Sequence, residues 1–358
     1  MLLLISALAR AGASDDLRSI LANRVDQKKA VGIIVATIDP QGRNMVSYGT
    51  VAKNSGDAPD GNTVFEIGSV TKVFTSLLLA DMVERGEVQL DEPVADLLPK
   101  TVEVPSHNGR QITLLDLSMQ SSGLPRLPTN LRPADFTNPY ADYTPAKLYE
   151  FLSGYTLTRD PGEKYEYSNL GAGLLGHALA LKAGTSYEEL LRKRILDPLG
   201  MHDTSITLTA DQRKRLAPGY NTALDPAANW TFDALAGCGA LHSTANDLLT
   251  FLGANMEFTD TPLKAAMRRM RSIRKPTGMP DLDIAMAWHI FTRFGGEIVW
   301  HNGGTFGYRS FIGFDPAAKK GVVVLCNTFI DNDDVGLHAL DSRYRVAVFG
   351  NGAEPKTN

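Results

Sequence analysis

The spacing of apolar positions changes twice along the chain. Apolar runs over residues 32–38 and 44–50, joined by Pro40-Gln-Gly42, predict a β-hairpin. The spacing becomes helical between about residues 70 and 270, and short β-rich runs return after Pro280. We therefore expect an α/β fold in which both ends of the chain build a sheet and a helical domain is inserted between them.

The individual elements follow from the same periodicity. Later strands are predicted at residues 297–301, 308–314 and 321–326. Helices are predicted at residues 14–27, 70–84, 145–153, 170–182, 187–196, 244–256 and 335–349. Ser14 is the expected N-cap of the first helix, because its hydroxyl can accept a hydrogen bond from a free N–H of the first turn.

The first residues allow two interpretations, and the sequence leaves both open. Met1–Ala9 is apolar and is followed by Ala11-Gly-Ala13, which is typical of the end of a secretory signal and favours a periplasmic or secreted protein. No basic residue precedes the run, however, and Arg10 interrupts its exit. The segment is equally the apolar side of a first helix in a cytoplasmic protein. No other stretch reaches about 18 uncharged apolar residues, so we expect no membrane span.

Composition narrows the classes of function. The chain has 358 residues, of which 43% are hydrophobic and 21% charged, as in ordinary globular proteins. Its net charge of −4 gives no overall attraction to nucleic acid. Two cysteines, Cys238 and Cys326, exclude a four-cysteine metal site and favour two buried thiols over one disulfide. No two histidines stand at metal-ligand spacing, so neither a metal nor another cofactor is expected.

Three stretches could be taken for functional motifs, but each also has a plain structural interpretation. Residues 125–145 contain five prolines and predict a long irregular loop, either a surface excursion or the wall of a cleft. The basic cluster between Lys264 and Lys275 is expected to be a solvated face rather than a nucleic-acid patch. Gly171-Ala-Gly173-Leu-Leu-Gly176 matches a dinucleotide-binding pattern but does not follow an apolar strand, so we expect close helix packing there.

The segment Phe65-Glu-Ile-Gly-Ser69-Val-Thr-Lys72 carries the clearest chemical signal. Ser69 ends an extended run and opens a strongly apolar helix, where residues three apart share a face. The Lys72 amine can therefore reach the Ser69 hydroxyl. A serine is a useful nucleophile only when a base takes its proton, and the free N–H groups of a helix N-terminus suit a developing oxyanion. Ordinary capping by Ser69 beside a solvent-seeking Lys72 is the structural alternative.

Two further groups of polar residues follow in the sequence. Tyr167-Ser168-Asn169 stands at a loop-to-helix junction, and His301-Asn302-Gly303-Gly304 ends a predicted strand, where glycines let a substrate backbone lie close. Together with Ser69-x-x-Lys72, these groups resemble the motifs of the penicillin-recognising serine hydrolases. That family includes class C β-lactamases, D-alanyl-D-alanine carboxypeptidases, D-aminopeptidases and related carboxylesterases.

The resemblance implies a fold and a place for the site. It extends over roughly residues 14–350 and implies an antiparallel sheet with flanking terminal helices plus an inserted all-helical domain. We assign residues 14–68 and 275–358 to the α/β sheet domain and residues 69–274 to the mainly helical domain. The active site is expected between the two domains.

The resemblance also implies a role for each motif residue. Ser69 would be the catalytic nucleophile, and Lys72 and Tyr167 would share the transfer of protons to and from it. Asn169 would hold the substrate amide and orient Lys72. The backbone N–H groups of Ser69 and Gly304 would form the oxyanion hole. The substrate-binding residues expected from the resemblance are Asn169, His301, Gly303 and Gly304.

One position departs from the β-lactamases, which carry a lysine where this chain has His301. Two interpretations stay open: the imidazole faces a substrate carboxylate, or it caps the strand and bonds to the Lys72–Tyr167 network. The expected function is that of a serine hydrolase acting through an acyl-enzyme on an amide, β-lactam or ester bond of a small molecule. The alternatives are a carboxylesterase, and a D-alanyl-D-alanine carboxypeptidase or penicillin-binding protein with slow turnover.

Overall fold

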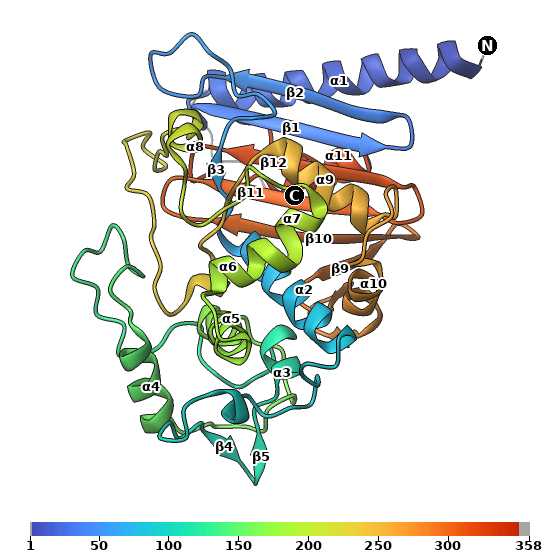
Figure 1. Ribbon diagram of the computed structural model, residues 1–358. Helices are drawn as coiled ribbons and strands as arrows, with labels where there is room; N and C mark the ends of the chain where they lie inside the picture. The colour runs from blue at the N-terminus through green and yellow to red at the C-terminus, as the bar shows by residue number, and fades with distance from the viewer. Residues whose placement is uncertain (1, 351–358) are drawn as a thin grey trace.

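An eight-stranded antiparallel sheet forms the centre of the fold (Figure 1). The computed structural model describes residues 2–350, and its main sheet has the strand order β2-β1-β12-β11-β10-β9-β8-β7. Where the two ends of the chain meet, β1 pairs with β12 and Ile33 lies opposite Cys326. The strands are β1 (Gly32–Asp39), β2 (Gly42–Gly49), β7 (Lys275–Pro276), β8 (Leu282–Ile284), β9 (His289–Arg293), β10 (Gly296–Gly304), β11 (Arg309–Asp315) and β12 (Lys320–Cys326).

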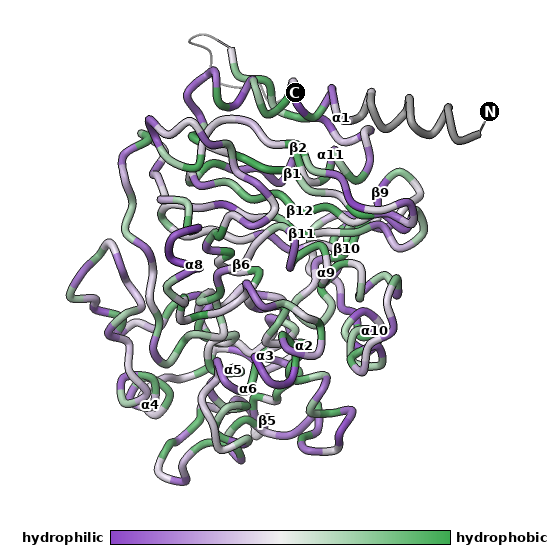
Figure 2. The backbone as a smooth tube through the Cα atoms, turned by 45° about the horizontal axis from the view of Figure 1, so that its top comes forward, coloured by the Kyte–Doolittle hydropathy of each residue, from purple (hydrophilic) through white to green (hydrophobic). Residues whose placement is uncertain are grey.

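Helices cover both faces of the sheet. Along β1, Ile33 belongs to one apolar cluster and Ile34 to another, on opposite faces. The first cluster is closed by α1 (Leu2–Asp26) and α11 (Asp333–Leu340), and the second by α9 (Ala245–Asn255) and the helical half of the chain. Burial on both faces explains why the central strands are continuous apolar runs. Figure 2 shows these apolar stretches along β1 and β12, while the exposed α8 is strongly hydrophilic.

The helical half of the chain is arranged around α2 (Thr71–Glu84). Of its 14 residues, 12 are buried, which accounts for an apolar composition on all sides of the helix. The helices that pack against it are α3 (Leu114–Ser118), α5 (Asn169–Ala183), α6 (Tyr187–Leu191) and α10 (Lys264–Ser272). Further helices of this half are α4 (Pro145–Gly154), α7 (Asp197–Leu199) and α8 (Ala210–Arg215).

Two short strand pairs lie outside the main sheet. β3 (Phe65–Glu66) pairs with β6 (His242–Ser243), and β4 (Ser106–His107) pairs with β5 (Arg110–Gln111). The first pair matters for the site, because it fixes the backbone that leads into Ser69.

Small residues let α5 approach a neighbouring segment closely. A Cβ atom added to Gly173 would lie 2.6 Å from Cδ2 and 2.9 Å from Cα of Leu235. One added to Gly176 would lie 2.9 Å from Cα of Gly237. The interpretation of this glycine pattern as close helix packing is therefore confirmed.

The predicted fold class is confirmed, but both terminal helices differ from the prediction. The first helix begins at Leu2 and not at Ser14, whose hydroxyl instead accepts a hydrogen bond from Asn44 Nδ2 at 3.0 Å. The last helix ends at Leu340 and not near residue 349. Its end has a local cause, since the Asp341 carboxylate accepts a hydrogen bond from the N–H two residues further on, a turn that competes with helix.

The helix predicted over residues 187–196 is interrupted. Its regular part, α6, ends at Leu191, and Arg192–Leu196 continue as a π-helical turn. Leu191 and Leu196 are both buried. The wider turn keeps the segment helical while it changes the side-chain spacing.

Several expectations based on composition can be compared with the structure. Cys238 and Cys326 are buried and free, which confirms the interpretation as two core thiols. The residues of the basic cluster are exposed or half-buried, and four of them form ion pairs, such as Arg268 with Glu257 at 2.6 Å, as expected of a solvated face. Within residues 2–350, no helix combines the length and the hydropathy needed to cross a membrane.

The domain boundaries stay a prediction. The strands of the main sheet fall within residues 32–49 and 275–326, while residues 351–358 of the predicted sheet domain lie outside the described residues. Helix α9 comes from the segment assigned to the helical domain, yet it packs directly on β1 and β12.

The close packing of α5 predicts a destabilised variant. Gly173→Ala places a methyl group against the backbone of Leu235, which cannot move aside, and we expect the free energy of unfolding to fall by about 1–3 kcal/mol in urea titrations. Gly154→Ala in α4 is the matched control, because a Cβ there meets nothing within 4 Å. That control should be neutral or slightly stabilising. Equal effects of the two substitutions would contradict the packing argument.

Candidate active site

Ser69 and Lys72 lie together at the start of α2. Ser69 sits in the 3₁₀ turn Gly68–Val70 that opens the helix, and Lys72 is 1% exposed. The Lys72 ammonium donates hydrogen bonds to Ser69 Oγ at 2.9 Å and to the backbone carbonyl of Cys238 at 2.7 Å. The two side chains predicted to form a catalytic pair are therefore in direct contact. Burial of the lysine argues against a side chain that merely reaches for solvent.

Glycines bring strand β10 against the turn that carries Ser69. Gly68 has φ +48°, and a Cβ there would lie 2.7 Å from the backbone nitrogen of Gly304. A Cβ on Gly303 would lie 2.0 Å from the carbonyl oxygen of Ile67. Side chains at these positions would force the two elements apart. The close approach sets the backbone of Gly304 beside the serine turn, as an oxyanion hole shared by Ser69 and Gly304 requires.

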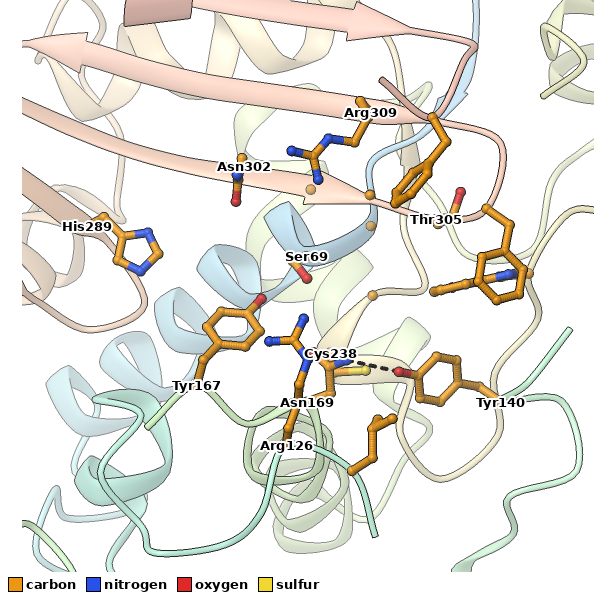
Figure 3. Close-up of a pocket in the computed structure, with 18 of the residues that line it drawn as sticks. Ser69, Arg126, Tyr140, Tyr167, Asn169, Cys238, His289, Asn302, Thr305 and Arg309 are labelled. Atoms are coloured by element: carbon orange, nitrogen blue, oxygen red, sulfur yellow. Dashed lines mark hydrogen bonds between the residues drawn. The ribbon is translucent and has the colours of Figure 1, made fainter. Parts of the chain in front are cut away.

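Tyr167 and Asn169 reach the site from the N-terminal end of α5. Ser168 between them caps this helix, since its hydroxyl accepts from the N–H of Gly171 at 2.8 Å. Lys72 Nζ lies 4.8 Å from the centre of the Tyr167 ring, and the Tyr167 hydroxyl points toward Ser69 (Figure 3). The three residues expected to be catalytic thus meet at one point, although they come from two elements nearly a hundred residues apart.

A cavity of about 620 Å³ opens in front of Ser69. It is lined from the helical half by Ser69, Arg126, Tyr167 and Asn169, and from the sheet by His289, Asn302, Gly303, Gly304 and Arg309. Arg126 and Tyr140 belong to the irregular loop at residues 125–145, so of its two interpretations the wall of a cleft is confirmed.

One side of the cavity is aromatic. The rings of Tyr140 and Phe232 stack with their centres 4.8 Å apart, and Trp230 contacts Tyr140 at 5.3 Å and Phe306 at 4.8 Å. Phe306 is 42% exposed although it is large and apolar. These four residues, here called the aromatic wall, can hold an apolar substituent of a substrate.

His301 is buried in the wall behind the cavity. Its ring is 1% exposed and stacks on His289 with the ring centres 5.1 Å apart, and its Nδ1–H donates to the carbonyl oxygen of Asn302. Burial, followed by His289 and by the Lys72 charge, lowers the pKa of His301 well below its usual range. Burial and Lys72 lower the pKa of His289 to about 4. Both rings are neutral at pH 7, so His301 does not supply the charge that a lysine would.

Positive charge reaches the cavity from arginines instead. Arg309 donates to Asp331 at 3.0 Å and lies 3.9 Å from Asp333, which also accepts a hydrogen bond from Asn302. Burial, followed by the charge of Asp331, raises the pKa of Asp333 to about 7. Arg126 lies over the opposite face of the site, with its guanidinium 4.9 Å from the Tyr167 ring centre.

Sequence reasoning missed several residues that line the cavity, among them Arg126, Tyr140, His289 and Arg309. Arg126 and Tyr140 lie in a loop without regular structure, where only the proline and aromatic content hinted at a function. His289 and Arg309 lie on the strands on either side of β10, and the register pairs His289 with Trp300 and Arg309 with Gly304. Such neighbours become visible only once the strand pairing is known.

The described part of the chain also shows whether side chains are grouped in a way that could bind a metal ion. Across residues 2–350, no group of three or more His, Cys, Asp or Glu side chains has an arrangement able to hold a metal ion. The chemistry considered below uses only side chains and backbone groups of the site.

The family follows from comparison with known proteins. A family model described as "Beta-lactamase" matches residues 17–343. The chain belongs to the β-lactamase family. The resemblance seen in the three motifs, to the penicillin-recognising serine hydrolases, is thereby confirmed.

Individual relatives agree with the family assignment. A D-alanyl-D-alanine carboxypeptidase/endopeptidase of Escherichia coli, AmpH, is 34% identical over 62% of this chain, an alignment that spans 57% of that relative's length. A β-lactamase of the same species is 27% identical over 85% of each chain. The solved structure of a β-lactamase/D-alanine carboxypeptidase from Yersinia pestis has a TM-score of 0.79 and 26% identity, and covers 93% of this chain and 97% of that one.

Asp333 predicts a pH-dependent stability. A carboxyl whose pKa is raised from 3.8 to about 7 on folding stabilises the protein fully only below pH 3.8, and this contribution is lost as the pH rises to about 7. The natural protein should lose this stability as the pH rises, whereas Asp333→Asn should not. We therefore expect the free energy of unfolding of Asp333→Asn, relative to that of the natural protein, to rise by roughly 1–3 kcal/mol from pH 4 to pH 8. Urea titrations at both pH values measure this difference.

Asp341, at the other end of α11, is the matched control. Hydrogen bonds from Arg343 lower the pKa of its carboxyl, so its stabilising contribution is present above pH 3.8 and lost in acid. Asp341→Asn should therefore be less stable than the natural protein by about the same amount at pH 4 and at pH 8, since its contribution changes only in more acidic solution. A gain from pH 4 to pH 8 as large in Asp341→Asn as in Asp333→Asn would contradict the assignment for Asp333.

Proposed function

We propose that the protein is a serine hydrolase that cleaves a small-molecule amide, β-lactam or ester through an acyl-enzyme. The observation that carries the proposal is the 2.9 Å contact between Lys72 Nζ and Ser69 Oγ at the base of the cavity. Ser69 is the nucleophile, and Lys72 with Tyr167 moves its proton. A serine hydroxyl attacks a carbonyl usefully only when a neighbouring group accepts that proton.

The reaction proceeds in two balanced steps. Ser69 Oγ bonds to the substrate carbonyl carbon and the bond to the leaving group breaks. In this step Lys72 acts as a neutral amine, which accepts the serine proton while the Tyr167 hydroxyl passes a proton to the leaving group. Water then adds to the acyl-enzyme, releases the carboxylic acid and returns the proton to Ser69. In both steps, the backbone N–H groups of Ser69 and Gly304 stabilise the negative charge on the carbonyl oxygen.

The lining of the cavity supports a division of substrate contacts. Asn169 holds the amide of a substrate acylamino group, and the adjacent aromatic wall receives its apolar substituent. Gly303 and Gly304 let the substrate lie against β10. The relatives named as carboxypeptidase and β-lactamase support amide and β-lactam substrates.

Arg309 is the proposed partner of a substrate carboxylate. Its guanidinium lies against the β10 strand, since a Cβ on Gly304 would be 3.1 Å from Arg309 Nη1. An arginine offers several donors to a carboxylate and stays charged at every relevant pH. His301, neutral and buried, supplies no comparable charge.

A carboxylesterase is the second candidate. The neutral His289–His301 stack and the exposed apolar residues at the cavity rim, among them Leu127 and Phe306, favour an uncharged ester. Sustained cleavage of p-nitrophenyl acetate without turnover of nitrocefin would support it. A stoichiometric burst with nitrocefin and no further turnover would instead indicate a penicillin-binding protein.

Ser69→Ala tests the proposed function directly. We expect the variant to lose turnover of both p-nitrophenyl acetate and nitrocefin, since no hydroxyl remains to form the acyl-enzyme. It should also lose covalent labelling by a fluorescent penicillin or fluorophosphonate, measured by mass spectrometry of the intact protein. An adduct on another residue, or natural activity in the variant, would refute the assignment.

Arg309→Gln tests carboxylate recognition. The ratio of kcat/KM for nitrocefin, which carries a carboxylate, to that for uncharged p-nitrophenyl acetate should fall by about 10-fold or more, because a charged hydrogen bond is lost. Arg274→Gln is the control, since Arg274 pairs with Glu297 away from the cavity. An unchanged ratio in Arg309→Gln would remove Arg309 from substrate binding.

A further inference from the structure

The side-chain amide of Asn169 is held at one end only. Its Nδ2 donates a hydrogen bond to the Tyr140 hydroxyl at 2.9 Å, drawn as the dashed line in Figure 3. Its Oδ1 is shielded from solvent and has no hydrogen-bond partner within residues 2–350. A buried acceptor left unpaired costs about 1–3 kcal/mol, and Asn169 lines the cavity, so a substrate N–H that displaces the atoms covering Oδ1 would relieve that cost.

Tyr140 is itself fixed rigidly. It is 4% exposed, and its ring stacks on Phe232 with an angle of 17° between the planes while Trp230 packs beside it. Burial raises the pKa of the Tyr140 hydroxyl, which therefore keeps its proton throughout the physiological range. In the contact present here the hydroxyl oxygen accepts from Nδ2, which leaves Oδ1 as the free end of the Asn169 amide.

The contact matters because a carboxamide has two chemically different ends. Rotation by half a turn exchanges its donor and its acceptor, and an unheld amide samples both arrangements. An acylamino group carries an N–H and a C=O, and its N–H complements the Oδ1 atom that the Tyr140 contact leaves free. Fixing one end thus prepares the other for the substrate before binding.

We propose that Tyr140 is a positioning residue for Asn169, whose hydroxyl fixes the side-chain amide for recognition of a substrate acylamino group. The inference rests on the proposed function, because it assigns the free end of Asn169 to the substrate. It makes the irregular loop at residues 125–145 part of the recognition apparatus as well as a wall of the cavity. Tyr140 acts through Asn169 and takes no part in bond breaking.

Two p-nitrophenyl esters of equal chain length test the proposal. The N-acetylglycyl ester carries an acylamino group, and the pentanoyl ester replaces that group by methylenes. The measured quantity is the ratio of their kcat/KM values, corrected for uncatalysed hydrolysis. Tyr140→Phe keeps the ring in the aromatic wall and removes only the hydroxyl. We expect it to lower the ratio about 3- to 10-fold, the usual worth of one neutral hydrogen bond.

Tyr143→Phe is the matched control. Tyr143 lies in the same loop and is fully buried, but its hydroxyl donates to Asn130 at 2.9 Å and not to Asn169. Its removal should leave the ratio unchanged, while thermal unfolding reports any loss of stability in either variant. In an Asn169→Ala background, Tyr140→Phe should cause no further fall in the ratio, because Tyr140 then has nothing to position.

Three results would overturn the proposal. They are an unchanged ratio in Tyr140→Phe, an equal fall in Tyr143→Phe, and a full further fall when Tyr140→Phe is combined with Asn169→Ala. Turnover of the pentanoyl ester that depends on Ser69 tests the proposed function alone, since this ester has no amide. Loss of that turnover would refute both proposals, whereas its presence with an unmoved ratio would refute only the role of Tyr140.

Discussion

The site depends on the close approach of strand β10 to the turn that carries Ser69. A Cβ on Gly303 would lie 2.0 Å from the carbonyl oxygen of Ile67, and one on Gly68 would lie 2.7 Å from the backbone nitrogen of Gly304. These distances leave no room for side chains, so two elements from opposite ends of the chain meet backbone to backbone. The sheet built from both ends is what makes the meeting possible. Helix α2 then carries Lys72 from the serine turn into the core, where the lysine reaches back to Ser69.

Burying Lys72 determines the character of the residues around it. The acceptors of its hydrogen bonds within residues 2–350 are a hydroxyl and a backbone carbonyl, both neutral, so the ammonium is solvated by dipoles rather than by a carboxylate. A second permanent charge nearby would add like-charge repulsion in a poorly solvated region. The stacked His289 and His301 avoid this cost, because burial and the Lys72 charge keep both imidazoles neutral. His301 therefore adds no positive charge beside Lys72 at the position where the β-lactamases carry a lysine.

Much of this arrangement could be predicted from the sequence, and the remainder has identifiable causes. Helical periodicity placed Ser69 and Lys72 on one face, and the order of strands and helices predicted the sheet. The role of His301 could not be settled in the same way, because alternation along β10 puts it on the side facing the core, and that orientation depends on strand register. Tyr140 was hidden for a different reason. It lies in a loop whose path is set by packing against Trp230 and Phe232, which no local pattern encodes.

Under the proposed function, Tyr140 also connects the two kinds of recognition on the acyl side of the substrate. Its ring belongs to the aromatic wall and its hydroxyl holds Asn169, so the same side chain borders the apolar substituent and the amide next to it. The carboxylate partner, Arg309, comes from a separate strand and is already partly neutralised by Asp331. Asp333 ionises near neutral pH and weakens the positive potential of Arg309 further as the pH rises. The acyl side of the cavity is therefore fixed by packing, while the proposed carboxylate binding at Arg309 weakens as Asp333 becomes charged.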